Sequence, residues 1–235
     1  MAETPELSVV ILCYRAEGYI VDFVQQVERE LQHTGITYEL VLVANYDTNY
    51  DTTPAWAAQV ASTHPHIKAL TEPKQGKMGW DMRSGLREAT GNYIAVIDGD
   101  GQMPVSDLLI VYHIIKKGQY DLVKTYRAVR NDGLVRMVLS KVYNLFFFLL
   151  FLPDFPVRDI NSKPKILTRQ AYQKLSLKSN DWFTDSEIMI QAFENKMRIC
   201  EVSTMFYKNQ LRHSFVGIRA IFEFIYNLFY YRIKR

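Results

Sequence analysis

The sequence predicts an α/β fold with a mostly parallel sheet and helices on both faces. Apolar, strand-like runs occupy residues 7–13, 39–44, 67–70 and 93–97, and helix-like stretches lie between them near 17–33, 53–63 and 77–89. Such alternation is typical of a parallel sheet covered by helices. Ligands of these sheets bind beyond the carboxyl ends of the strands. Tyr14, Asn45 and Asp98 each follow a predicted strand, so we expect them to line one site.

The next elements continue the pattern and then change in character. Residues 105–117 are expected to form a helix and 120–125 a strand. Residues 134–152 are expected to form a helix that begins with basic residues and ends in consecutive Phe and Leu before Pro153. Its purely apolar part is shorter than the ~20 residues needed to cross a bilayer. It leaves little polar face to cover the outside of a soluble protein, although a buried core helix is the alternative.

The last expected helix, residues 215–235, is strongly amphipathic. Arg219, Glu223 and Asn227 form a polar stripe at i, i+4 spacing, which Tyr231 and Arg235 extend. The rest is apolar up to a basic end, as in helices that lie in a membrane interface. The alternatives are packing against another subunit or against a small transmembrane partner, with the stripe in water.

Length and composition suggest one domain with an appendage. At 235 residues the chain can bury one substantial core, and we expect a domain over residues 1–212 and a helical appendage over 213–235. Cys13 and Cys200 lie in strand-like segments, which indicates reduced thiols and suits the cytosol. No signal peptide is expected at the first residues.

Charge is distributed unevenly along the chain. Residues 1–120 carry a formal charge of −6 and residues 121–235 carry +9. The basic half is therefore expected to meet anionic phosphates or an anionic membrane surface, with a solvated basic surface as the alternative. The basic residues alternate with long aliphatic runs and form no nucleic-acid motif, so nucleic-acid binding is not expected.

The turn after the strand at 93–97, residues 98–104 (DGDGQMP), points to a metal site. Asp98, Asp100 and Gln102 can offer oxygens to a hard cation such as Mg²⁺ or Mn²⁺. The intervening glycines, including Gly99, allow close approach of a ligand. A surface turn is one alternative. A calcium loop is another, but position six, Met103, and position twelve, Leu109, lack the Gly and Glu that it requires.

Several motifs in order resemble the inverting GT-A glycosyltransferases of family 2, and within it dolichol-phosphate mannose synthase and the bacterial polyprenyl-phosphate glycosyltransferases. They are residues 8–14 (SVVILCY), 76–85 (GKMGWDMRSG), 89–94 (ATGNYI), 98–104 (DGDGQMP), 158–165 (RDINSKPK), 181–187 (DWFTDSE) and 201–202 (EV). The resemblance implies a GT-A, Rossmann-like fold that transfers a sugar from a nucleotide diphosphate (GDP-mannose or a UDP-sugar) to a dolichyl or undecaprenyl phosphate. The resemblance also implies that this protein is a peripheral membrane protein at the cytoplasmic face of the cell membrane.

The resemblance also implies roles for individual residues. A divalent metal would be held by Asp98, Asp100 and Gln102 and would stabilise the leaving diphosphate. The lipid phosphate is already anionic, so attack on the anomeric carbon needs no protein base. Asp98, Asp100, Arg127 and Arg136 are the expected catalytic residues. The acceptor phosphate is expected to meet Arg127, Arg130, Arg136, Ser140, Lys141, Lys208 and Arg212.

The donor loops depart from the family pattern. Donor binding is expected from Leu12, Tyr14, Glu17, Ala44, Asn45, Lys77, Asp98, Gly99 and Asp100, with Glu17 and Asn45 standing where relatives carry other residues. Asp185 and Glu187 are candidate sugar-binding residues, although acids in the first turn of a helix also stabilise the helix itself. The alternatives to the leading function are extension of a glycan acceptor and non-catalytic binding of a nucleotide sugar.

Overall fold

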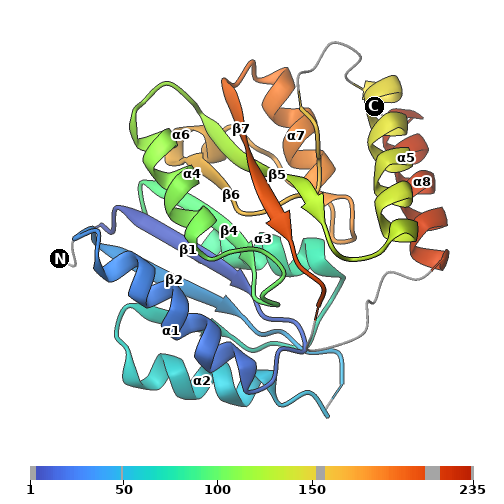
Figure 1. Cartoon of the computed structure of the whole chain (residues 1–235). Helices are drawn as coiled ribbons and strands as arrows, with labels where there is room; N and C mark the ends of the chain where they lie inside the picture. The colour runs from blue at the N-terminus through green and yellow to red at the C-terminus, as the bar shows by residue number, and fades with distance from the viewer. Residues whose placement is uncertain (1–3, 49, 152–156, 210–217, 234–235) are drawn as a thin grey trace.

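The computed structural model describes residues 4–48, 50–151, 157–209 and 218–233. The described strands form a sheet in the order β3-β2-β1-β4-β6-β5-β7 (Figure 1). The strands are β1 (Leu7–Leu12), β2 (Tyr38–Val43), β3 (Ile67–Leu70), β4 (Tyr93–Asp98), β5 (Leu122–Arg130), β6 (Lys165–Thr168) and β7 (Ile199–Phe206). The helices are α1 (Tyr19–Gln32), α2 (Thr53–Thr63), α3 (Met78–Glu88), α4 (Ser106–Lys116), α5 (Leu134–Phe151), α6 (Arg169–Gln173), α7 (Thr184–Glu194) and α8 (Ile218–Ile233).

The parallel half of the sheet brings the predicted loops together. β1 lies between β2 and β4, and Leu12 at its end is in register with both Val43 and Asp98. The loops after these strands therefore leave the sheet at the same edge. This confirms the predicted α/β class and brings the loops that carry Tyr14, Asn45 and Asp98 to one edge of the sheet.

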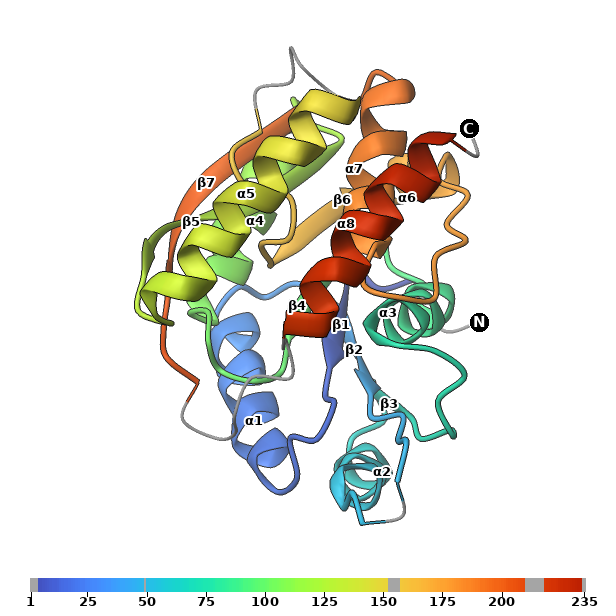
Figure 2. The ribbon, with the colours of Figure 1, turned by 90° about the vertical axis from the view of Figure 1, so that its right-hand side faces the viewer.

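Helices cover both faces of the sheet. Alternate residues of β1 point to opposite faces: Val9 and Ile11 join a core with α1, α2 and α4, whereas Val10 and Leu12 join a core with α3, α6 and α7. Figure 1 shows these two helical layers, and Figure 2 shows α5 and α8 side by side as an outer pair over the second core. A Cβ on Gly85 of α3 would lie 2.4 Å from Val10, so glycine allows this helix to pack closely on the sheet.

The second half of the sheet differs from the simple alternation. β6 runs antiparallel between β4 and β5, and β5 pairs in parallel with β7. β5 also continues to Arg130, beyond the expected end at residue 125. β6 was not predicted from the sequence, because this strand is only four residues long and begins with a lysine. Lys165 is buried there because it forms an ion pair with the buried Asp185.

The polar stripe of α8 is turned toward the protein, not toward water as the sequence suggested. Glu223 forms an ion pair with Lys77, Asn227 donates to Asp181 at 3.0 Å, and the Tyr231 hydroxyl donates to Glu187 at 3.2 Å. Lys77 immediately precedes α3, Asp181 lies in the loop before α7, and Glu187 lies on α7. Residues 215–217, 234 and 235 of the expected helix, and the predicted domain boundary at 212–213, lie outside the described residues.

Apolar side chains of both outer helices consequently face outward. On α8, Tyr226, Phe229, Tyr230 and Ile233 are exposed, the last at 83%. On α5, the exposed residues follow one stripe: Leu134, Val138, Val142, Leu145 and Leu149. Among the described residues, no helix combines the length and the hydropathy that a membrane span requires.

Candidate active site

A cleft of about 300 Å³ lies at the carboxyl ends of β1, β2 and β4. Its walls include loops after these strands, the start of α3 and residues from the second half of the sheet. They are Leu12, Tyr14, Asp47, Lys74, Gly76, Lys77, Met78, Asp81, Asp98, Asp100, Gln102, Met103, Arg127, Arg136, Asn161, Lys163, Trp182, Phe206 and Asn209.

The turn after β4 directs oxygen atoms into this cleft. Gly101 has a φ of +67°, a backbone conformation that residues with a side chain rarely adopt. A Cβ on Gly99 would lie 3.1 Å from the Leu12 carbonyl oxygen, so glycine allows the turn to pack closely on the end of β1. The Gln102 amide nitrogen donates to the Tyr207 carbonyl at 2.9 Å, which fixes the side chain. Asn209 Nδ2 lies 3.4 Å from Asp100 Oδ2 and 3.5 Å from Gln102 Oε1. These two oxygens therefore converge on one point.

This donor set fits a hard divalent cation. Carboxylate and amide oxygens are the ligands that Mg²⁺ and Mn²⁺ accept, and such ions commonly take their remaining ligands from substrate phosphates and water. Among the described residues, His, Cys, Asp and Glu side chains form no cluster of three or more with metal-binding geometry. Asp98, Asp100 and Gln102, completed by a ligand, therefore remain the predicted ligands of such an ion.

Asp98 belongs to a buried charge network that the sequence analysis did not identify. Lys163 Nζ lies 3.4 Å from Asp98 and 3.0 Å from Asp185. Asp185 also pairs with Lys165. Burial alone would lower the pKa of Lys163, but the two carboxylates outweigh burial and raise it above the usual range of a lysine. Lys163 is thus a buried lysine in the wall of the cleft whose charged form is favoured by two carboxylates.

The loops after β1 and β2 form the opposite wall. The Tyr14 hydroxyl donates to Asp47 at 2.6 Å, and Arg15 pairs with the same carboxylate at 3.0 Å. Although burial raises the pKa of Asp47, these hydrogen bonds outweigh it and lower the pKa. Lys74 Nζ lies 4.0 Å from the centre of the Tyr14 ring and pairs with Asp81. The Tyr14 ring and Asp81 thus hold the Lys74 ammonium at the wall of the cleft.

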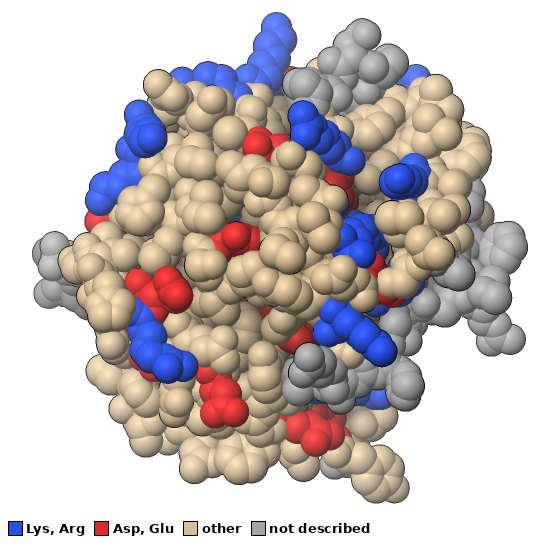
Figure 3. All heavy atoms as spheres, in the orientation of Figure 1, with Lys and Arg blue, Asp and Glu red and all other residues tan. Residues whose placement is uncertain are grey.

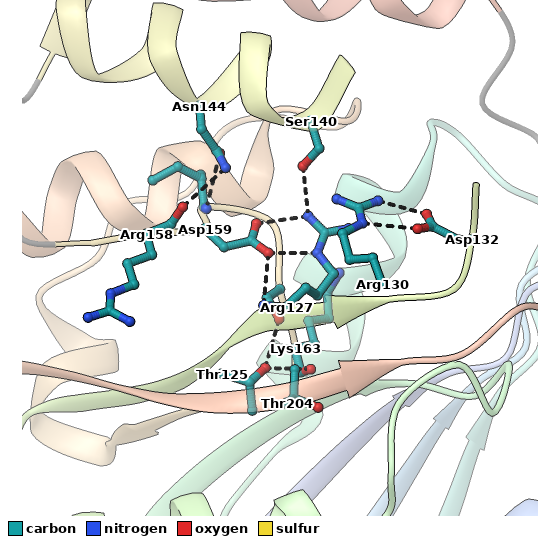
Figure 4. A network of polar contacts seen from close by, with 12 residues as sticks. Thr125, Arg127, Arg130, Asp132, Ser140, Asn144, Arg158, Asp159, Lys163 and Thr204 are labelled. Atoms are coloured by element: carbon teal, nitrogen blue, oxygen red, sulfur yellow. Dashed lines mark hydrogen bonds and ion pairs between the residues drawn. The ribbon is translucent and has the colours of Figure 1, made fainter. Parts of the chain in front are cut away.

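Two arginines at the end of β5, Arg127 and Arg130, are held by internal carboxylates (Figure 4). Arg127 binds Asp159 through Nε at 2.6 Å and Nη2 at 2.8 Å, and donates to Ser140 at 3.2 Å. Burial would raise the pKa of Asp159, but Arg127 holds it far below the usual range. Arg130 makes a bidentate pair with Asp132.

Arg136 is less completely compensated than the other two arginines. Its Nε lies 3.5 Å from Asp132, a carboxylate that already receives two hydrogen bonds from Arg130. Burial lowers the pKa of Arg136, with Asp132 opposing. Figure 3 shows basic side chains close together on this side of the molecule, where β5 leads into α5. An additional anion would therefore be stabilised here.

A second cavity of about 200 Å³ adjoins the first and is lined in part by residues of α5 and by Phe224 of α8. One part of its wall is polar and consists of Arg127, Arg130, Arg136, Ser140, Asn161, Lys163 and Asp185. The other part is apolar and consists of Met78, Leu139, Val142, Tyr143, Trp182 and Phe224. Met78, Arg127, Arg136, Asn161, Lys163 and Trp182 line both cavities. The arrangement suits a ligand with an anionic head and an apolar tail.

Several predicted residues lie away from the two cavities. Glu17 is exposed, with a φ of +49°, and its backbone N–H donates to Thr53 at 2.8 Å. Ala44 is buried, and Asn45 lies behind the cleft, where it donates to Asp81 at 3.2 Å. Lys141 and Lys208 are exposed and are absent from the described walls of both cavities. Arg212 lies outside the described residues.

Asp185 and Glu187 prove to be structural contacts of α7. Asp185 pairs with the two buried lysines described above, and Glu187 accepts backbone hydrogen bonds from Lys178 and Ser179 at 2.9 and 3.0 Å. Neither side chain caps α7, whose N-cap residue Phe183 makes no side-chain capping bond. Asp185 lines the second cavity, whereas Glu187 is absent from the described walls of both cavities. A sugar-binding role remains a prediction for both residues.

Several residues that line the first cavity were not predicted from the sequence. They are Asp47, Lys74, Asp81, Asn161, Lys163, Trp182 and Asn209. Two of them, Asn161 and Lys163, belong to the quoted motif at 158–165, and Trp182 belongs to the motif at 181–187. The motifs thus contained site residues, but the sequence did not show that their side chains reach the cleft. Asn161 and Lys163 do so because they directly precede β6, which lies in the middle of the sheet.

The fold and the cleft define an α/β protein with a nucleotide-type site at the carboxyl ends of its parallel strands. The chain belongs to glycosyl transferase family 2, whose family model matches residues 8–176. The resemblance found in the sequence is therefore confirmed.

Its curated relatives include enzymes named for transfer to polyprenyl phosphates. Dolichyl-phosphate beta-glucosyltransferase ALG5D of Trichomonas vaginalis is 24% identical over 193 residues, which cover 78% of this chain and 58% of the relative. Undecaprenyl-phosphate 4-deoxy-4-formamido-L-arabinose transferase of Yersinia pestis is 24% identical over 140 residues, 60% of this chain and 42% of the relative. The chain thus spans about half the length of these relatives.

Solved structures support the fold. Glucosyl-3-phosphoglycerate synthase from Mycobacterium tuberculosis, in complex with Mn²⁺, UDP and phosphoglyceric acid, superposes with a TM-score of 0.72. The superposition covers 96% of this chain and 76% of that one, at 14% sequence identity. This likeness confirms the predicted GT-A type of architecture.

Proposed function

We propose that the protein transfers a sugar from a nucleotide diphosphate to a polyprenyl phosphate at the cytoplasmic face of a membrane. The observation that carries the proposal is the joining of two cavities of different character. The first offers oxygen ligands and cations to a nucleotide diphosphate, and the second combines arginines with an apolar wall. The names of the curated relatives support a lipid phosphate as acceptor.

A divalent ion, Mg²⁺ or Mn²⁺, is part of the proposal. Asp98, Asp100 and Gln102 would hold it, and when bound it would stabilise negative charge on the departing diphosphate as a Lewis acid. The solved neighbour that contains Mn²⁺ and UDP supports this assignment. Tyr14, Lys74 and Lys77 are placed to contact the nucleotide from the other side of the cleft.

The acceptor reacts as an anion. A phosphate oxygen would attack the anomeric carbon of the sugar while the bond from that carbon to the diphosphate breaks, and the leaving group takes the electron pair. Because a phosphate monoester is ionised at neutral pH, no side chain must remove a proton. The task of this chain is orientation: Arg136, supported by Arg127, would hold the phosphate, and the apolar wall would hold the first isoprene units.

The outward faces of α5 and α8 support a membrane surface as the place of reaction. Both helices contribute residues to the second cavity and carry exposed apolar side chains, and Val142 of α5 does both. The polar stripe of α8 is used for contacts with the protein. Exposed apolar patches of this kind mark interaction sites. A lipid that remains partly in the membrane could thus present its phosphate to the arginines. The free thiols of Cys13 and Cys200 fit a reducing compartment, as expected at the cytoplasmic face of a membrane.

One assay tests the function. The purified chain would be incubated with Mn²⁺, UDP- or GDP-sugars, and either polyprenyl phosphate or the free polyprenol in detergent. We expect labelled sugar on the polyprenyl phosphate and none on the alcohol, because the alcohol is not an anionic nucleophile. Equal transfer to both would refute the acceptor assignment. Transfer only to a soluble phosphorylated acceptor or to a glycan would refute the role of the apolar wall.

A further inference from the structure

Asn161 and Lys163 lie where the two cavities meet. Both side chains line the first cavity, which would hold the nucleotide diphosphate, and the second, which would hold the acceptor phosphate. The sugar that is transferred must occupy the space between these two groups. Residues that line both cavities are therefore the ones placed to contact it.

The two side chains differ in how their polar atoms are satisfied. Lys163 Nζ is held between Asp98, at 3.4 Å, and Asp185, at 3.0 Å. Asn161 Oδ1 is buried and has no hydrogen-bond partner among the described residues. A buried acceptor without a partner costs free energy unless a ligand or water supplies a donor. Asn161 therefore requires a hydrogen-bond donor from the contents of the cavity.

A sugar hydroxyl supplies what this junction lacks. Each hydroxyl can donate one hydrogen bond and accept others. It could donate to Asn161 Oδ1 or Asp98 and accept from the Lys163 ammonium. A fully ionised phosphate cannot satisfy Asn161, because it has no proton to donate. The junction thus differs in chemistry from the arginine cluster beside it.

The surrounding backbone holds the junction rigidly. Thr125 Oγ1 donates to the Lys163 carbonyl at 2.7 Å and also lies 2.8 Å from Ser162 Oγ. Lys165, two residues later, shares Asp185 with Lys163 but lines neither cavity among the described wall residues. The two lysines thus have a common carboxylate and different access to a ligand.

We propose that Asn161 and Lys163 form the subsite that recognises hydroxyl groups of the transferred sugar, with Asp185 as the residue that positions the ammonium. This inference rests on the proposed function, because it assumes that a nucleotide sugar occupies the first cavity. It assigns selectivity among sugars to two residues of the segment before β6, and not to the metal-binding turn.

A binding experiment tests the subsite without requiring turnover. Calorimetry with Mn²⁺ would compare UDP with UDP-glucose and GDP with GDP-mannose, for the wild type, Asn161→Ala and Lys163→Met. We expect the wild type to bind one nucleotide sugar more tightly than its free nucleotide. Asn161→Ala and Lys163→Met should each reduce that preference about tenfold and change the affinity for the free nucleotide less. Lys165→Met is the matched control, because it also removes a lysine from Asp185.

The outcomes separate the two proposals. The subsite would be overturned if Asn161→Ala and Lys163→Met both fold and both keep the wild-type preference for the nucleotide sugar over the free nucleotide. The proposed function would then remain intact. Loss of the preference in Lys165→Met to the same degree would also overturn the subsite, since the effect would then act through Asp185. If Lys163→Met does not fold, Lys163→Gln and Asn161→Ala decide the matter. A wild type that prefers no nucleotide sugar over its nucleotide would refute the donor assignment and the subsite together.

A kinetic measurement then identifies the hydroxyl. Transfer would be measured with the preferred donor and with its deoxy analogues. The wild type should discriminate against at least one deoxy analogue, and Asn161→Ala or Lys163→Met should reduce that discrimination to nearly one, because the contact that senses the hydroxyl is gone. Unchanged discrimination against every analogue would contradict the subsite.

Discussion

Replacing Arg136 with Gln should weaken use of the acceptor while leaving the donor site intact. Arg136 lines both cavities, and its side chain is 32% exposed. Its internal partner, Asp132, is 3.5 Å away and already binds Arg130, so Arg136 retains capacity for a further anion. Losing one charge-assisted hydrogen bond costs ~1.5–3 kcal/mol, which corresponds to a decrease in kcat/KM for the acceptor of roughly tenfold to a hundredfold.

The fold should tolerate this change. The Arg136–Asp132 contact is long and partly exposed, and such ion pairs contribute about 0–1 kcal/mol to stability. Arg127 differs, because Asp159 would remain buried without its cation if Arg127 were replaced, which costs about 3–5 kcal/mol. Arg136 is therefore the arginine whose replacement reports on the acceptor and not on folding.

Steady-state kinetics would vary polyprenyl phosphate and the nucleotide sugar separately. Lys117→Gln is the control, because Lys117 is an exposed residue after α4 and the change in charge is the same. Nucleotide affinity should change less than acceptor use in Arg136→Gln. An unchanged kcat/KM for the acceptor, or an equal loss of donor affinity, would refute the assignment of Arg136 to the acceptor phosphate.

Four further predictions concern the metal, the membrane, the outer helix and acid. Asp100→Ala should lower turnover by orders of magnitude without a change in melting temperature, because one metal ligand is lost; full activity of that variant in EDTA would contradict the metal site. Tyr230→Asp combined with Ile233→Asp should reduce flotation with anionic vesicles, because both side chains are exposed on α8, and salt should weaken binding of the wild type; a wild type that ignores such vesicles at low salt would contradict the membrane assignment. Asn227→Ala should lower the free energy of unfolding in urea by about 1 kcal/mol, because the hydrogen bond to Asp181 is lost; an unchanged value would mean that the stripe does not stabilise α8. Burial alone would raise the pKa of Asp159 and of Asp185, but the cationic partners of both carboxyls outweigh burial and lower the pKa. The two carboxylates therefore stabilise the fold fully above about pH 4, and this stabilisation is lost as the pH falls further. Equal free energies of unfolding at pH 6 and pH 3 would contradict this.

The first half of the fold could be predicted because its strands and helices are regular. β1, β2, β3 and β4 are short apolar runs separated by helices, and their predicted limits differ from the observed ones by one residue at most. The turn at 98–104 was predictable for the same reason, since it follows a buried strand directly. Local pattern and tertiary structure agree here.

The second half could not be predicted to the same extent because long-range pairing decides it. β6 contains a buried lysine whose charge is balanced by Asp185, twenty residues later, and whose ammonium also donates to the Ile160 carbonyl. Likewise, the stripe of Glu223 and Asn227 indicated a face for water, but Lys77 and Asp181 are its partners. Charged residues inside a protein depend on contacts that periodicity does not contain.

The place of β6 in the sheet also determines when the sheet can be completed during synthesis. The strands β3, β2, β1 and β4 can pair as soon as residue 98 has been made. β5 is made next, but its partners in the sheet, β6 and β7, come later in the chain. Until residues 165–168 are available, the nascent chain has an unpaired β4 edge, which is prone to pair with other chains. A ribosome that pauses between residues 98 and 165 should therefore favour aggregation more than one that pauses after residue 206.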